Sequence, residues 1–224
     1  IVKGTAPNDE ARAFVEAILR EQMTKFGITD QQILTLQGLD VTQKGPQNWE
    51  WVQGILRALD KHVPGASGAS IALATNDVYQ YLTSGGIRDI IEAGVRQAMT
   101  SERPTVVVSH SLGTVVSYQL LRRESVAAGW KVPTFVTLGS PLGVSRIRKE
   151  LRPISRPPCI GEWFNAMDER DVVALYPLDG ANFPVDPSIR NKTDVKNDTV
   201  NHHGISGYLS DPEVAKVIYD ALGT

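Results

Sequence analysis

The sequence has little cysteine and no long apolar run. Its 224 residues include one cysteine, Cys159, so no disulfide can form within the chain. A lone cysteine suits a reducing compartment, and we expect a cytoplasmic protein. No stretch approaches the roughly 18 consecutive apolar residues of a membrane span, so we expect no transmembrane segment. The chain begins at Ile1 rather than methionine, and we expect N-terminal residues, with any targeting signal, to be missing.

The charges give no large excess of either sign. Lysine and arginine number 23 and aspartate and glutamate 25, a formal net charge of −2, and both signs are scattered along the chain. No basic block indicates a nucleic-acid partner, and no acidic tail indicates a basic one. The length fits a single domain, 1–224, with a substantial core. Two stretches, 144–158 and 176–200, read as loop or lid excursions because the first is basic and both contain prolines.

The most informative stretch runs from Thr105 to Leu121. Four β-branched residues at 105–108 predict a buried strand, and apolar residues at helical spacing after Gly113 predict a helix. Ser111 lies at the corner between them. A strand–serine–helix corner of this kind is a nucleophile elbow, which projects the serine oxygen above the sheet. Small residues are required two places before and after the serine, and Ser109 and Gly113 stand there.

Periodicity predicts the remaining elements. Ser140 follows a strand, but we do not expect it to be the nucleophile, because Pro141 opposes a helix directly after it. The expected fold class is α/β. The expected helices cover 8–26, 48–62, 71–82, 87–99 and the residues from 212 onward, and the expected strands cover 1–4, 33–36, 131–139 and 160–167.

Two aspartates follow the strand expected at 160–167. A serine hydrolase needs a carboxylate that orients a histidine, and this carboxylate lies in a loop just after a strand. We favour Asp171, because the apolar Val172 and Val173 would fix the loop and bury the carboxylate. Asp168 is the alternative, with capping of the turn as its other role.

Two adjacent histidines precede the last helix. We favour His203 as the general base, because Gly204 would let the backbone turn its ring toward the serine; His202 is the alternative. We expect no metal site, because neighbours in sequence rarely ligate one ion and no His-Glu-x-x-His helix is present. We expect no cofactor.

Serine, aspartate and histidine therefore occur in the order Ser111, Asp171, His203. With the motifs at 108–113, 138–141, 165–171 and 203–209, this order makes the chain resemble the bacterial lipase/esterase-like α/β-hydrolases over roughly residues 70–222. The resemblance implies a mainly parallel sheet flanked by helices on both faces, the α/β-hydrolase fold. It also implies hydrolysis of a small-molecule ester through an acyl-serine.

The oxyanion site is where the sequence departs from that family. The backbone N–H of Leu112 is the expected first donor, and relatives take a second from a His-Gly loop near the N-terminus. Here Val2-Lys3-Gly4-Thr5 stands at that place, with lysine instead of histidine. Three functions therefore remain open: an ester hydrolase, a hydrolase-like fold used only for binding, and a thioesterase or amidase on the same triad. Substrate and oligomeric state are not encoded in any motif.

Overall fold

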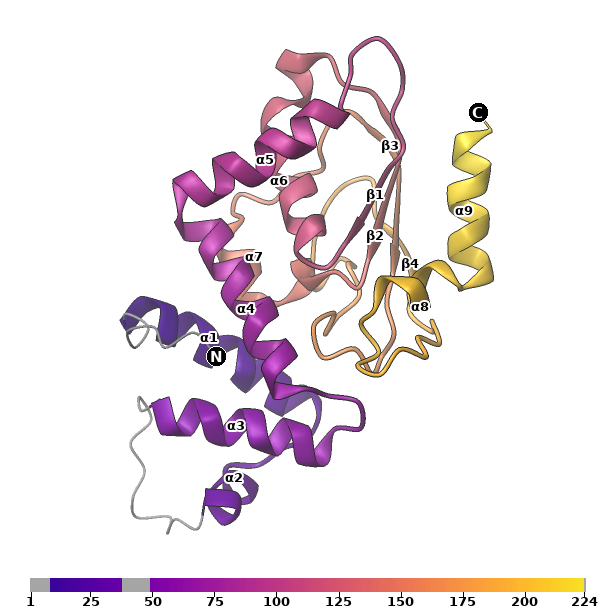
Figure 1. Cartoon of the computed structure of the whole chain (residues 1–224). Helices are drawn as coiled ribbons and strands as arrows, with labels where there is room; N and C mark the ends of the chain where they lie inside the picture. Colours follow the sequence, from indigo (N-terminus) through magenta and orange to yellow (C-terminus); the bar gives the residue numbers. More distant parts are fainter. Residues whose placement is uncertain (1–8, 38–48, 224) are drawn as a thin grey trace.

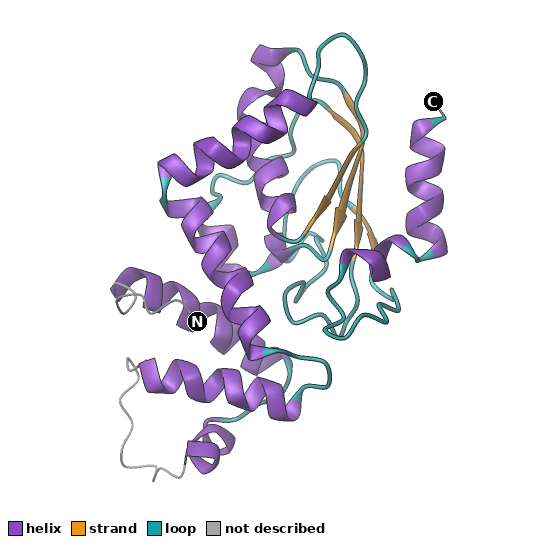
Figure 2. Cartoon of the chain, in the orientation of Figure 1, coloured by secondary structure: helices purple, strands orange, loops and turns teal. Residues whose placement is uncertain are grey.

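The protein, as a computed structural model, is described for residues 9–37 and 49–223 (Figure 1). The described residues form an α/β structure in which helices cover both faces of a parallel sheet (Figure 2). The expected strand at 1–4, with Val2-Lys3-Gly4-Thr5, lies outside the described residues. None of the described helices is long and apolar enough to cross a membrane.

Within the described residues, four parallel strands form the sheet in the order β1-β2-β3-β4. The register aligns their carboxyl ends, since His110 pairs with Leu138, Leu138 with Ala166, and Ala166 with Lys192. The loops that follow the strands therefore start at one edge of the sheet. The strands are β1 (Val107–His110), β2 (Val132–Leu138), β3 (Ile160–Ala166) and β4 (Arg190–Lys192).

Helices cover the two faces unequally (Figure 1). α4 to α7 lie on one face of the sheet and α9 on the other, while α1 to α3 form a group beneath the sheet, from which α1 also packs on α4 and α7. The bounds are α1 (Asp9–Lys25), α2 (Asp30–Gln37), α3 (Trp49–His62), α4 (Gly68–Thr83), α5 (Gly85–Ala98), α6 (Leu112–Ala128), the 3-10 helix η2 (Pro141–Gly143), α7 (Ser145–Glu150), α8 (Ile205–Leu209) and α9 (Pro212–Leu222).

The core follows this layering. Alternate residues of a strand point to opposite faces, so Phe135 packs toward α6 while Val136 packs toward α9. A third apolar cluster joins α1, α2 and α3, and it includes Val172 from the loop after β3. Because Val172 is 3 % exposed, this loop is fixed between the sheet and the helical group, as the sequence led us to expect.

One expected strand is a helix. Residues 33–36 lie within α2, where Ile33 and Leu34 are buried against α3. The helix begins with a capping box: the Thr29 N–H donates to Gln32 Oε1 at 2.8 Å, and the Gln32 N–H donates to Thr29 Oγ1 at 3.3 Å. The Thr-x-x-Gln signal was present in the sequence, and the expectation of a strand there was wrong.

The two excursions are partly regular. Residues 144–158 contain α7, and residues 176–200 contain the short strand β4. Ser140 is followed by the 3-10 helix η2 with Pro141 at its first position, not by an α-helix. Ser140 bonds Thr114 Oγ1 at 2.8 Å and is 2 % exposed.

Candidate active site

Ser111 lies at a sharp corner between β1 and α6. Its backbone adopts φ 53° and ψ −128°, an unusual combination for a residue with a side chain. The Ser111 N–H donates to the Leu138 carbonyl at 3.1 Å, which fixes the corner to the neighbouring strand. The strained turn points the hydroxyl away from the helix, as a nucleophile elbow requires.

Ser109 and Gly113, the small residues around the elbow, are small for different reasons. Ser109 is buried, and its hydroxyl lies 2.7 Å from the hydroxyl of Ser117 on α6, so strand and helix do approach closely there. A Cβ at Gly113 would meet no described atom within 4 Å. Gly113 instead lines an apolar groove between α5 and β1. The steric reason expected for Gly113 is therefore not found in the described part of the chain.

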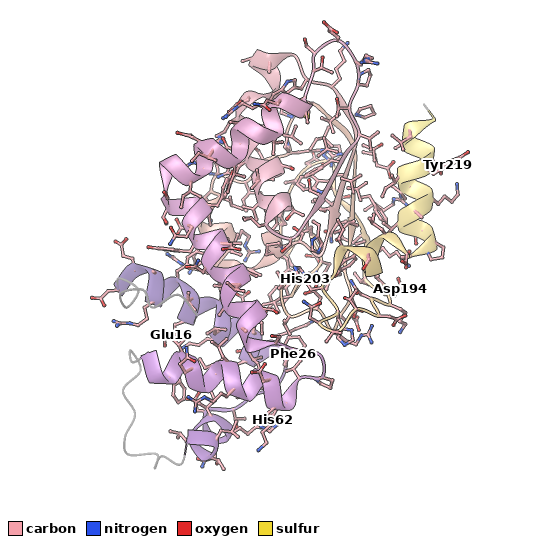
Figure 3. The ribbon with its side chains drawn as sticks, viewed as in Figure 1. Glu16, Phe26, His62, Asp194, His203 and Tyr219 are labelled. Carbon is pink, nitrogen blue, oxygen red and sulfur yellow. The ribbon has the colours of Figure 1, made fainter. Side chains whose placement is uncertain are left out.

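His203 lies in the loop after β4, and its ring contacts Ser111. Its Nε2 lies 2.8 Å from Ser111 Oγ, and its Nδ1 lies 2.7 Å from Asp171 Oδ2. An ionised carboxylate only accepts hydrogen bonds, so Nδ1 carries the proton and Nε2 is free to accept one from the serine. Figure 3 shows His203 at the end of the sheet that faces the α1–α3 group.

The Asp171 carboxylate is buried, and both of its oxygens accept hydrogen bonds. The residue is 1 % exposed, and an unpaired carboxylate buried to this degree would be strongly destabilising. Its Oδ1 accepts the backbone N–H groups of Val173 at 2.8 Å and Ala174 at 3.2 Å. Its Oδ2 accepts His203 Nδ1–H at 2.7 Å and the hydroxyl of Tyr208 at 2.6 Å. Four donors thus hold the carboxylate in one orientation.

The loop that carries Asp171 is also held from the helical side. Gln22 of α1 donates its side-chain N–H to the Val172 carbonyl at 2.6 Å. Gln22 is 2 % exposed, so this bond is shielded from water. The α1–α3 group therefore contributes to the position of the acid, although it supplies none of the three aligned side chains.

Asp168 occupies a different place. Its carboxylate accepts the Arg170 guanidinium at 2.6 Å and the Asn197 backbone N–H at 2.7 Å, and it makes no bond to His203. Burial pushes the pKa of Asp168 upward, but the hydrogen bonds from Arg170 and Asn197 outweigh it and lower the pKa below its ordinary value of 3.8. Asp168 anchors the start of the loop that leads to His203.

His202 points away from the serine. Its Nδ1 donates to the Asn197 carbonyl at 2.8 Å, and its backbone adopts φ 53°. This left-handed residue, rather than Gly204, lets the loop present His203, because Gly204 has an ordinary φ of −63°. Gly204 is required for space: a Cβ there would lie 2.6 Å from Thr199 Cγ2.

Three further residues near the triad were not identified from the sequence. His110 Nε2–H donates to the His203 carbonyl at 2.6 Å, and the two rings lie 4.7 Å apart. Burial, with the nearby His203, lowers the pKa of His110, which keeps it neutral as a donor. Gly139 and Tyr208 face Asp171 and His203 from the end of β2 and from α8. His110 directly precedes the elbow serine, which was the available signal.

The backbone N–H of Leu112 is a candidate donor to the oxyanion. Leu112 is the first residue of α6, so its backbone N–H has no acceptor within the helix. The helix dipole of this 17-residue helix favours negative charge at the same point. The segment expected to give a second donor lies outside the described residues. The described residues contain no group of three or more side chains suited to hold a metal ion.

No protein-family model, curated protein or solved structure significantly matches the chain.

Proposed function

We propose that the protein is a serine hydrolase that cleaves carboxylic esters through an acyl-serine, on an α/β-hydrolase-type fold. The observation that carries this proposal is the continuous chain of hydrogen bonds Ser111–His203–Asp171, at 2.8 and 2.7 Å. Its members come from the loops after β1, β3 and β4, and a strained corner presents the serine.

The chemistry follows from the geometry. His203 Nε2 takes the proton from Ser111 Oγ as the oxygen attacks the ester carbonyl, and Asp171 stabilises the resulting imidazolium. The backbone N–H of Leu112 donates a hydrogen bond to the oxyanion of the tetrahedral intermediate. Collapse of this intermediate breaks the bond to the alkoxide, to which His203 returns the proton. A water molecule, activated by the same imidazole, then releases the acid and restores Ser111.

An active-site-directed probe tests the proposal directly. We expect a fluorophosphonate to add once, on Ser111, with fluoride as the leaving group, because this is the serine within residues 9–37 and 49–223 whose hydroxyl bonds a histidine ring. Intact-mass measurement followed by peptide mapping gives the site. Ser140 is the internal control, since its described partners are Thr114 and the Leu142 N–H. A folded protein that remains unlabelled, or is labelled equally on other serines, contradicts the proposal.

Gly139 offers a second test. The residue adopts φ +55°, and a Cβ would lie 2.9 Å from Tyr208 Cε2, 3.2 Å from Asp171 Oδ2 and 3.2 Å from His203 Cε1. We expect Gly139→Ala to lower kcat/KM for a p-nitrophenyl ester by about 10²-fold, because small displacements of the base are costly. In urea, the free energy of unfolding of Gly139→Ala should be about 1–2 kcal/mol lower than that of the unaltered protein, because alanine is strained in this left-handed backbone.

Gly27→Ala is the matched control for this substitution. Gly27 adopts φ +66°, but a Cβ there meets no described atom within 4 Å. It therefore carries the same backbone penalty without a contact to the triad. Equal kcat/KM values for the two variants would mean that the space beside Gly139 has no role in catalysis.

A further inference from the structure

Tyr208 contacts the carboxylate of the proposed triad directly. The side chain is fully buried on α8, and its hydroxyl donates to Asp171 Oδ2 at 2.6 Å. The same oxygen accepts the proton of His203 Nδ1. Because Asp171 Oδ1 is already satisfied by two backbone N–H groups, Tyr208 and His203 share the oxygen that faces the base.

The tyrosine is fixed from several directions. Its oxygen also accepts the Asp168 backbone N–H at 3.3 Å, so one hydroxyl connects both aspartates of the loop after β3. Burial, followed by the charge of Asp171 and the hydrogen bond to it, raises the pKa of Tyr208 far above its ordinary value. The hydroxyl therefore remains a donor throughout the pH range in which an ester hydrolase works.

We infer that Tyr208 is a positioning residue that sets how strongly Asp171 stabilises the protonated form of His203. The inference rests on the proposed function. A donor on Oδ2 withdraws negative charge from that oxygen, so the carboxylate attracts the imidazolium less strongly. The tyrosine thus keeps the base from holding its proton too tightly when it must return that proton to the leaving alkoxide.

The other charged and titratable groups near this contact are few and identifiable. His110 lies beside His203 at the end of β1, and its pKa is lowered by burial and by His203. Asp168 and its ion-pair partner Arg170 lie on the far side of Tyr208. Removing the tyrosine hydroxyl takes an acceptor from the Asp168 backbone N–H, but the Asp168 carboxylate keeps its bonds to Arg170 and to the Asn197 N–H. A change at His203 is therefore assigned to the contact of Tyr208 with Asp171.

Tyr208→Phe tests the inference. We expect the midpoint of the acid limb of kcat/KM to rise by about 0.5–1 pH unit, because Asp171 regains charge and holds the imidazolium more firmly. The ring titration of His203, followed by NMR in a chain with four histidines, should move in the same direction. The Nδ1 proton should shift downfield as its hydrogen bond to Asp171 strengthens.

Tyr81→Phe is the matched control. Tyr81 is also fully buried, and its hydroxyl donates to the buried carboxylate of Glu92 at 2.7 Å, away from the triad. We expect Tyr81→Phe to lower the unfolding midpoint in urea without moving the pH profile. A merely structural Tyr208 would behave in the same way, and an unshifted acid limb in Tyr208→Phe overturns the inference.

A second variant acts in the opposite direction. Replacement of Tyr208 by 3-fluorotyrosine makes the hydroxyl a stronger donor, so the acid limb should move to lower pH. This variant decides the question if Tyr208→Phe fails to fold. If the unmodified protein shows no Ser111-dependent hydrolysis, the proposed function fails, whereas the NMR titration still reports whether Tyr208 acts on His203.

Discussion

Replacing Ser111 by alanine is expected to lower kcat for a p-nitrophenyl ester by on the order of 10⁶-fold, to a remnant supplied by binding and the oxyanion donor. In the proposed mechanism Ser111 Oγ forms the bond to the acyl group, and His203 Nε2 lies 2.8 Å from it. Single-turnover and steady-state assays of the purified variant measure the loss. The fold should persist, because the corner is tied to β2 by the Ser111 backbone N–H, which alanine keeps, whereas the Ser111 hydroxyl bonds His203.

Ser140→Ala is the matched control for this experiment. Ser140 also follows a strand at the same edge of the sheet and is 2 % exposed, but its hydroxyl bonds Thr114. We expect its kcat to stay within tenfold of that of the unaltered protein. Turnover that survives Ser111→Ala would favour the alternative in which the fold serves only to bind ligands, and it would assign the hydrolysis to a contaminant or another residue.

Asp171→Asn is expected to lower kcat by about 10⁴-fold. The asparagine amide would donate a hydrogen bond to His203 Nδ1, which must then be unprotonated. The ring proton would move to Nε2, and a protonated Nε2 cannot accept the proton of Ser111. The pH dependence of kcat should change as well, because hydroxide can replace the lost base at high pH. The expected rise in rate with pH, together with retained structure by circular dichroism, distinguishes a tautomer defect from unfolding.

Asp168→Asn provides the comparison. This carboxylate is 2 % exposed and paired with an Arg170 side chain that is 45 % exposed, so we expect a loss of about 2 kcal/mol of stability and less than tenfold in kcat. The pKa of Asp168 is lowered in the folded protein, so its stabilising effect is complete above about pH 3.8 and is lost as the pH falls through the folded value. The stability difference should therefore vanish in strong acid. Equal losses of kcat in the two variants would contradict the assignment of Asp171 as the acid.

Local patterns in the sequence were sufficient for the elbow. A β-branched run followed by helical periodicity identifies a strand and a helix, and Ser111 lies between them. The expectation of a buried strand at 105–108 was wrong in its bounds and burial, because β1 spans Val107–His110 and Val108 is 38 % exposed. Local patterns also identified most helices, because their apolar stripes and caps are properties of neighbouring residues. The polar β4, at Arg190–Lys192, has no such pattern and is a strand only through its pairing with β3.

The choice between neighbouring residues depended on the tertiary structure. His202 and His203 have the same local context, and only the left-handed backbone at His202 and the bonds of Asn197 decide which ring faces Ser111. Asp168 and Asp171 are likewise distinguished by their partners: the Asp168 carboxylate accepts the Arg170 guanidinium, and the Asp171 carboxylate accepts the Tyr208 hydroxyl.

The sequence by itself determined an α/β chain with a serine, Ser111, at a strand–helix corner, followed by two candidate aspartates, Asp168 and Asp171, and by two candidate histidines, His202 and His203. Only the tertiary structure decided that these three side chains align, and that Gly139 and Tyr208 enclose them. The physical reason is the difference in sequence separation between the interacting residues. Helix and strand signals arise from residues a few positions apart, whereas the site joins loops separated by up to 92 residues, which meet because four parallel strands end at one edge of the sheet.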